Sequence, residues 1–289
     1  MTVKTAVTAS LGNRRPPLLK IRPRVGVAAI NIREVWQFRD LLISLAGRDV
    51  RLRYKQTMLG AAWVVLQPLL GAGIFAFVFG AVANLSAGNV PYFIFSYVGL
   101  LGWNVFNTTL SKSSVCLVGN SQLISKIYFP RLVLPLSTVP SALIDFAVAA
   151  AMLIILLPLY HLHPGIEILL MPVFLTLIVL LSIGIGLVTA ALTVSYRDVQ
   201  YILPVLTQFL LYASPVAYPV SRVPLRFQRI YFLNPLSGLF EAFRWSILGT
   251  DGGQMRLGAT LYASAVCVIV FVFGVWAFKA MERRFADII

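Results

Sequence analysis

Acidic residues, cysteines and catalytic motifs are scarce in this sequence or absent from it. It has 10 Asp and Glu against 24 Lys and Arg, and only two cysteines in 289 residues. Cys116 and Cys267 form no CxxC pair and have no histidine at metal-ligand spacing, so they are predicted to be inert packing residues. No GxxxxGK[ST] loop, GxSxG elbow or HExxH helix occurs. The usual signals for nucleotide binding and hydrolytic catalysis are therefore missing.

Charged residues are also missing from one long stretch, and this absence defines the class of protein. Residues 56–111 contain no Lys, Arg, Asp or Glu, although about 20 apolar residues are enough to cross the hydrocarbon. Hydrophobic residues make up 59% of the chain and charged residues 12%, and the mean hydropathy is +0.85. A soluble domain of this length cannot bury so much apolar surface. We therefore predict an all-α polytopic membrane protein.

The hydropathy pattern predicts six transmembrane helices. Their expected ranges are roughly 59–83, 92–114, 132–158, 169–194, 199–219 and 258–278. An even number puts both termini on one side, and the distribution of Lys and Arg assigns that side to the cytoplasm. The exceptions fall in one outward connection: Arg222, Arg226, Arg229, Arg244 and Arg256.

The outward connection contains signals for a helix of its own. Asn234 suits an N-cap, Pro235 a first helical position and Gly249 a helix end. Because a short apolar helix is unsuited to water, we expect the connection, about residues 220–257, to form a re-entrant segment that dips into the membrane. Glu241 and Arg244 lie three residues apart on this helix and are expected to pair, either as a gate or simply for stability.

Half of the Lys and Arg residues precede the first span. Residues 1–33 are polar, basic and interrupted by proline, which indicates a disordered cytoplasmic tail. Residues 34–56 are expected to form an amphipathic interface helix, with an apolar face made of Val35, Phe38, Leu41, Leu42 and Leu45. This helix is either a lipid-resting anchor or a docking element for a partner. Residues 57–289 form the predicted transmembrane domain.

Two features inside the predicted spans are open to more than one interpretation. Asp145 is the single acid within a span, and its cost in lipid favours a structural or interface role over a proton relay. Span four carries small residues that favour close helix packing over a binding site: Ser182, Gly184, Gly186 and Ala190.

Four stretches of the chain together resemble one known family. They are RDVRLRYKQTMLGAAW (48–63), KIYFPRLVLPLS (126–137), YRDVQYILPVLTQFLLYASPVAYP (196–219) and NPLSGLFEAFRWSILG (234–249). In this order they resemble the type-2 ABC permeases that export polysaccharides such as O-antigen, capsule and teichoic acid. The resemblance covers the chain from about Glu34 to its end.

The resemblance implies a homodimeric permease of the bacterial cytoplasmic (inner) membrane. Two copies of a separate ABC ATP-binding subunit would bind ATP and Mg, so no cofactor is expected in this chain and the chain is not expected to be an enzyme. The expected substrate is a lipid-linked glycan moved outward. The excess of basic residues is accordingly assigned to membrane lipids or an acidic partner, and not to nucleic acid.

The resemblance also implies a re-entrant helical pair between spans five and six, at about residues 222–252, and roles for particular residues. The loop that docks on the ATPase corresponds to Lys126, Tyr128, Phe129, Pro130 and Arg131. A channel through the dimer would be lined by aromatic side chains, for which we select Trp63, Phe75, Tyr97, Trp103 and Tyr212. Charge complementarity makes four cations candidate contacts for the substrate headgroup, although they are equally explained by the positive-inside rule: Arg48, Arg51, Arg53 and Lys55.

Other classes of function stay open on the sequence. An ion-coupled secondary transporter needs more ionisable residues within its spans and often an internal repeat, and neither is visible. A membrane-embedded glycosyltransferase or lipid-modifying enzyme needs acids at headgroup level, for which only Asp198 and Glu167 are available. Within the resembled family, an exporter of a drug or a small lipid is the nearest alternative.

Overall fold

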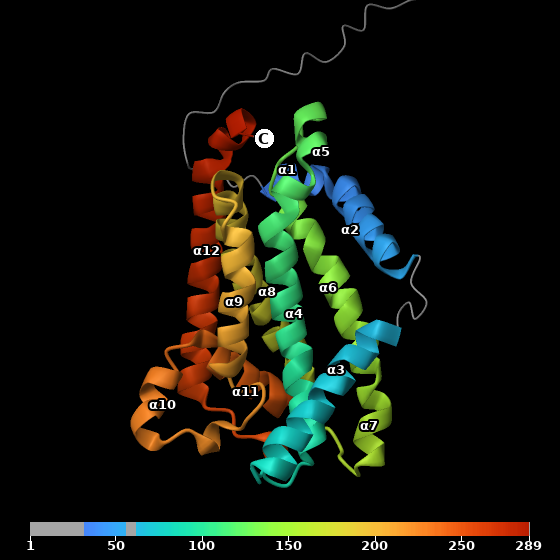
Figure 1. Cartoon of the computed structure of the whole chain (residues 1–289), viewed down its shortest axis with the longest axis vertical. Coiled ribbons are helices and arrows are strands. Elements are labelled where there is room, and N and C mark those ends of the chain that lie inside the picture. Colours follow the sequence, from blue (N-terminus) through green and yellow to red (C-terminus); the bar gives the residue numbers. More distant parts are fainter. Residues whose placement is uncertain (1–31, 56–61, 289) are drawn as a thin grey trace, which may run out of the picture.

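The described part of the chain is a helical bundle. A computed structural model describes residues 32–55 and 62–288, and within these ranges it contains helices and no strand (Figure 1). Nearly all of the predicted tail, 1–33, and the join between the amphipathic helix and the first span lie outside the described residues. The all-α class is confirmed.

The elements follow one another in a simple order. The α-helices are α1 (Ile32–Gln37), α2 (Arg39–Tyr54), α3 (Ala62–Phe75), α4 (Tyr92–Gly119), α5 (Ser121–Lys126), α6 (Val133–Ala151), α7 (Leu153–Leu159), α8 (Met171–Ser195), α9 (Val199–Tyr212), α10 (Leu225–Tyr231), α11 (Pro235–Leu248) and α12 (Leu257–Ile288). A π-helical segment, η1 (Ala76–Val82), continues α3, and short 3-10 turns are η2 (Ile166–Leu170), η3 (Val220–Arg222) and η4 (Gly249–Gly252).

The bundle has two distinct ends. Helices α4, α6, α8, α9 and α12 run roughly along its long axis (Figure 1). Helix α5 and the C-terminus lie at one end, which we call the α5 end. Helices α10 and α11 lie at the opposite end, which we call the α10 end.

Four helical segments are long and apolar enough to cross a membrane. They are Ala62–Val82, Val133–Leu159, Ile166–Ser195 and Leu257–Glu282, and they correspond closely to the predicted spans at 59–83, 132–158, 169–194 and 258–278. The other two predicted spans correspond to α4, which is long but carries polar side chains and Lys112, and to α9, which has only 14 residues. The described chain therefore contains several helices that are suited to cross a membrane.

The amphipathic segment before the first span is helical but broken. Phe38 interrupts it between α1 and α2, where the sequence predicted one helix. Leu45 and Ala46 of α2 are buried, and α2 packs against α6. The predicted apolar face thus meets protein, whereas Trp36, Ile43 and Leu52 remain exposed.

The small residues of α8 allow a very close helix contact, as the sequence predicted. A Cβ added at Gly184 would lie 2.8 Å from the Phe271 backbone of α12, and one added at Gly274 would collide with the Gly184 carbonyl. Ser182, Gly186 and Ala190 are buried on the same helix. Helices α8 and α12 therefore touch backbone to backbone.

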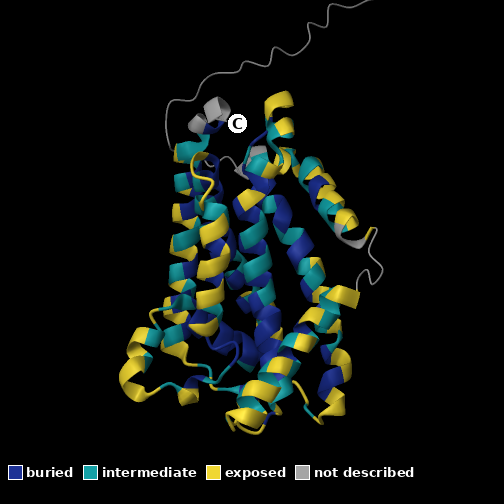
Figure 2. Ribbon diagram, in the orientation of Figure 1, coloured by how far each residue is buried: buried dark blue, intermediate teal, exposed yellow. Residues whose placement is uncertain are grey.

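Helix α11 is the most enclosed element of the described chain. All of its residues from Leu236 to Leu248 are buried except Trp245 (Figure 2). Asn234 caps its start by accepting a hydrogen bond from the Leu236 amide at 3.1 Å, and Gly249, with a φ of 63°, ends it. The capping signals read from the sequence are confirmed. Protein, and not lipid, covers this helix.

Candidate functional site

The loop after α5 projects from the α5 end of the bundle. Lys126 ends α5, and the side chains of Ile127 and Tyr128 that follow are 55% and 76% exposed. Phe129 and Pro130 turn inward and are buried, with Phe129 in the cluster that α2, α8 and α12 share. One half of the predicted coupling motif is thus presented outward, and the other half anchors it.

Arg131 connects this loop to the C-terminal helix. Its Nη1 donates a hydrogen bond to the Glu282 carbonyl at 2.6 Å, and its guanidinium lies 5.8 Å from the centroid of the Phe285 ring. Phe285 is fully buried, and Lys279 forms an ion pair with the Glu282 carboxylate at 2.8 Å. A movement of the loop would therefore displace α12 directly through these contacts.

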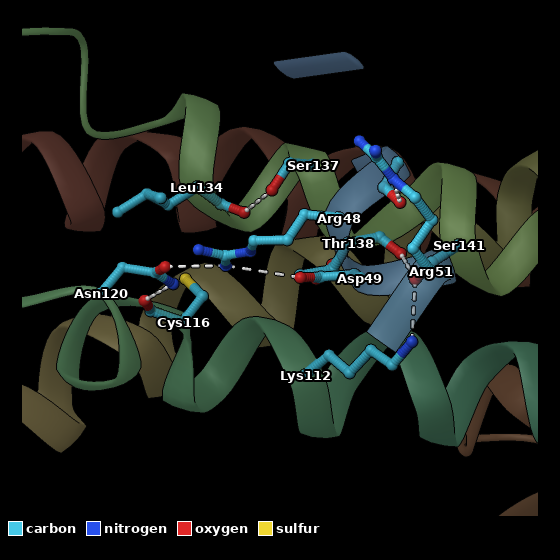
Figure 3. Close-up of polar contacts among 11 residues, drawn as sticks. Arg48, Asp49, Arg51, Lys112, Cys116, Asn120, Leu134, Ser137, Thr138 and Ser141 are labelled. Carbon is cyan, nitrogen blue, oxygen red and sulfur yellow. Dashed lines mark hydrogen bonds and ion pairs between the residues drawn. The ribbon is translucent and has the colours of Figure 1, made fainter. Parts of the chain in front are cut away.

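A polar cavity lies beneath α2, next to this loop. It has a volume of about 350 Å³ and is bounded by α2, α4 and α6. Arg48 donates from Nη2 to Asn120 Oδ1 at 2.9 Å and lies 3.4 Å from Asp49 Oδ1 (Figure 3). Asn120 in turn donates to the Cys116 carbonyl at 2.8 Å, so Arg48 ties α2 to the end of α4.

The cations predicted to contact a headgroup do not form one cluster. Arg51 is exposed and donates from Nε to the Gly47 carbonyl at 3.2 Å, within its own helix. Lys55 is exposed at the end of α2, and the side chain of Arg53 lies outside what the structure describes. Of the three whose side chains the structure describes, Arg48 alone lines the cavity.

The sequence analysis missed Lys112, which also lines this cavity. Lys112 lies within α4, and its Nζ donates to Ser141 Oγ of α6 at 2.8 Å (Figure 3). It lies inside the predicted span 92–114 and directly follows the uncharged stretch 56–111. Asp145, one turn beyond Ser141, has an interaction partner as well. The sequence could have placed Lys112 within a helix, because it lies inside a pattern of apolar residues at helical spacing.

The predicted channel aromatics occupy two kinds of environment. Tyr97 is buried and donates to the Ala149 carbonyl at 2.7 Å, and Trp103 is buried against Phe240 of α11, with ring centroids 6.2 Å apart. Trp63 and Tyr212 are 45% and 50% exposed, and Phe75 is partly buried. Tyr97 and Trp103 are thus core residues within one chain, and the channel role of all five stays a prediction.

Arg244 does not pair with Glu241, contrary to the sequence prediction. Its Nη2 donates to the carbonyl of Pro215 and, at 3.3 Å, to that of Val216, and its guanidinium lies 3.7 Å from the centroid of the Phe95 ring. No ion pair with Glu241 forms, although both side chains are buried. The predicted pairing is wrong, since the guanidinium reaches instead the carbonyls that the end of α9 leaves without helical partners.

Those carbonyls belong to an irregular segment that follows α9. Residues 214–217 are buried, yet they have left the helix and lack its internal hydrogen bonds. Further side chains donate to the carbonyls of this turn: Asn234 to Ala213 at 3.3 Å, Tyr92 to Ala217 at 2.6 Å and Tyr218 to Tyr212 at 2.7 Å. Irregular backbone at membrane depth is tolerated only when protein satisfies it in this way.

No metal-binding cluster is found within 32–55 and 62–288. No group of three or more His, Cys, Asp or Glu side chains converges there, and Cys116 and Cys267 are buried free thiols. The polar groups of the α5 end are suited to contacts with a protein or with a headgroup.

Apolar crossings, a buried short helix and a broken helix held by side-chain donors together define a polytopic helical membrane protein. The chain belongs to the ABC-2 type transporter family, whose model matches residues 40–248. The resemblance noted in the sequence is confirmed.

Three relatives of this chain carry related names. The chain is 31% identical to the O-antigen export system permease protein RfbA of Myxococcus xanthus over 215 residues, which are 74% of this chain and 82% of that protein. It is 27% identical to the RfbA permease of Klebsiella pneumoniae over 251 residues, 86% of this chain and 95% of that one. It is 25% identical to the polysialic acid transport protein KpsM of Escherichia coli over 242 residues, 82% and 91% of the two chains.

Proposed function

We propose that this chain is the membrane-spanning subunit of an ATP-driven exporter that moves a lipid-linked polysaccharide outward across the bacterial cytoplasmic membrane. The observation that carries the proposal is the similarity to export permeases over most of the length of both chains. A substrate such as a drug or a small lipid has no comparable support, since the relatives are named for O-antigen and polysialic acid.

The energy source is a separate ATP-binding subunit, because this chain has no phosphate-binding loop of its own. The exposed Ile127 and Tyr128, beside the cationic end of α5, offer a protruding contact for such a subunit. The exposed face of α2, with Trp36, Ile43 and Leu52, offers a second. Two copies of this chain and two ATP-binding subunits form the working unit.

The proposed topology has six crossings with both ends in the cytoplasm. Helix α4, with 28 residues, is about 42 Å long and exceeds the thickness of the hydrocarbon. Helix α9 and the buried turn after it form the fifth crossing, and α10 and α11 form the re-entrant pair. The α5 end carries Arg48, Arg51, Lys126 and Arg131 and is assigned to the cytoplasm by the positive-inside rule.

In the proposed mechanism, closure of the two ATP-binding subunits displaces the loop after α5 and helix α2. Arg131 passes the displacement to α12 through its hydrogen bond to Glu282, and Arg48 passes it to α4 through Asn120. The path between the two protomers then opens for the glycan. Arg48 and Lys112, at the cavity beneath α2, are the cations nearest to an arriving headgroup.

Deletion of the gene in its native host tests the exported substrate. We expect the surface polysaccharide to disappear and its lipid-linked form to accumulate inside the cell, measured by surface labelling and lipid extraction. The wild-type gene on a plasmid should restore export. Normal surface polysaccharide in the deletion strain would contradict the proposal.

Co-purification tests the contact with the ATP-binding subunit. Tyr128→Ala should reduce recovery of the tagged subunit with this chain at least several-fold, because an exposed aromatic anchor is lost from the interface. Tyr201→Ala is the matched control, since Tyr201 is 78% exposed but lies on α9. Equal recovery with both variants would refute the docking assignment.

A further inference from the structure

The arginines of the α10 end lack acidic partners. Arg222, Arg226, Arg229 and Arg256 are all exposed, and within the described residues none of them forms an ion pair with an acid. Of the two acids in this connection, Asp251 accepts from Asn89 at 3.3 Å, and Glu241 is buried and attracts Arg256 without forming an ion pair with it. On the outer side of a membrane such an excess of arginine is disfavoured. The excess of arginine at this end therefore predicts that an anion outside the described chain binds there.

Two of these arginines line a cavity between α10 and the start of α12. The cavity has a volume of about 450 Å³ and no acid in its wall. Its lining residues are Leu225, Gln228, Arg229, Phe232, Leu233, Arg256, Ala259 and Tyr262. Arg256 is held in place, because its Nη1 donates to Gln228 Oε1 at 2.9 Å and its guanidinium lies 5.0 Å from the Phe232 ring centroid. The remaining N–H groups of the two guanidinium ions suit a phosphate.

An apolar strip continues from this cavity along α12. Tyr262, Ile269, Phe273 and Trp276 are exposed, and their spacing of 7, 4 and 3 residues keeps them on one face of the helix. From Tyr262 to Trp276 the strip extends about 21 Å at 1.5 Å per residue. The cavity and strip together match a ligand with an anionic head and a long apolar tail.

We propose that this cavity binds the phosphate headgroup of an anionic phospholipid from the outer leaflet, with an acyl chain lying along the strip on α12. The inference depends on the proposed function only for the orientation that puts the α10 end outside. A free phosphate ion would account for the arginines but not for the apolar strip.

Native mass spectrometry of the purified full-length chain, with phosphatidylglycerol or phosphatidylcholine added to the micelles, tests the proposal. We expect phosphatidylglycerol to be retained and phosphatidylcholine to be lost. Arg229→Gln should weaken retention about five-fold and the double variant Arg229→Gln/Arg256→Gln roughly 25-fold, from the contribution of each cation to binding of an anionic lipid. Arg229 makes no hydrogen bond in the described structure, so the single variant should fold normally.

The matched control is Arg222→Gln/Arg226→Gln, which removes two charges from the same surface outside the cavity wall. It should retain phosphatidylglycerol nearly as wild type does. Equal loss in the control and in the cavity variants, or equal retention of phosphatidylcholine, would overturn the assignment. So would binding of inorganic phosphate by the cavity together with no retention of phosphatidylglycerol.

Orientation is tested separately, with a membrane-impermeant maleimide on Ser221→Cys in intact cells. Labelling from outside together with no phosphatidylglycerol retention would refute this inference and leave the proposed function standing. Labelling only after lysis would refute the orientation, and with it the outer-leaflet source of the lipid.

Discussion

At the scale of single residues, the structure shows what a spacing rule can and cannot reveal. The three-residue spacing of Glu241 and Arg244 predicted a pair, but Arg244 binds the carbonyls of Pro215 and Val216. Those carbonyls are free only because α9 ends at Tyr212, whereas the predicted span ran to 219 and ignored Pro215 as a stop signal. The caps at Asn234 and Gly249, by contrast, were predictable, because they depend only on local chemistry.

Arg244→Met should destabilise the chain much more than Glu241→Gln does. The first substitution leaves two buried carbonyls without a donor, at a cost of about 1–3 kcal/mol for each unsatisfied group. The second removes a carboxylate that forms no ion pair, so its effect should be small. Thermal unfolding of the two variants in detergent measures the difference. Equal losses would mean that the two side chains do act as a pair.

At the scale of helices, the small residues of α8 were correctly interpreted and the amphipathic segment only in part. Gly184 and Ala190 predicted close packing without naming the partner, which proved to be α12. The apolar face of α2 was predicted from its spacing, but the break at Phe38 and the burial of that face against protein were not. Periodicity shows that a face is apolar and does not show what covers it.

Gly274→Ala should separate α8 from α12. The added methyl group would collide with the Gly184 carbonyl, and overpacking of this kind costs about 1–3 kcal/mol. Gly73→Ala is the control, because a Cβ there meets nothing within 4 Å and alanine favours the helix. We expect a lower melting temperature for the first variant and an equal or higher one for the second. A melting temperature unaffected by Gly274→Ala would disprove the close contact.

Leu45→Ala should loosen α2 from the bundle and uncover Cys116. Both side chains line the cavity beneath α2, and Cys116 is only 7% exposed. Deletion of a buried leucine side chain costs about 2 kcal/mol or more, so maleimide labelling of Cys116 should accelerate roughly ten-fold or more. Ile43→Ala, on the exposed face of α2, is the control and should leave the rate unchanged. Labelling of Cys267, identified by peptide mapping, serves as an internal reference.

At the scale of the whole molecule, composition established the membrane class and hydropathy located four crossings closely. Helices α4 and α9 do not meet the criteria of hydropathy and length for a membrane span, and each has a physical reason. Polar groups such as Lys112 and Ser113 of α4 face other helices, so its hydropathy falls although its length suffices. Helix α9 is short because the chain leaves the helix at a turn that α11 and Tyr92 support. Burial by neighbouring helices is a tertiary property and leaves no simple mark on a hydropathy profile.

Single added cysteines should report opposite sides of the membrane at the two ends of the bundle. Ser86→Cys, in the exposed turn before α4, should react with an impermeant maleimide in intact cells. Ser125→Cys, exposed on α5, should react only after lysis. The wild-type chain is the blank, since Cys116 and Cys267 are buried. Reaction of both positions from the same side would contradict the six-crossing topology.

Where Gly184 meets Gly274, no side chain separates the backbones of α8 and α12. Arg131, through the Glu282 carbonyl, fastens the loop after α5 to the far end of the same α12. A shift of the loop would therefore reach two long helices at once, and they would tilt as one rigid unit. A rigid pair of helices would transmit a small displacement from one membrane surface to the opposite one with little loss of amplitude.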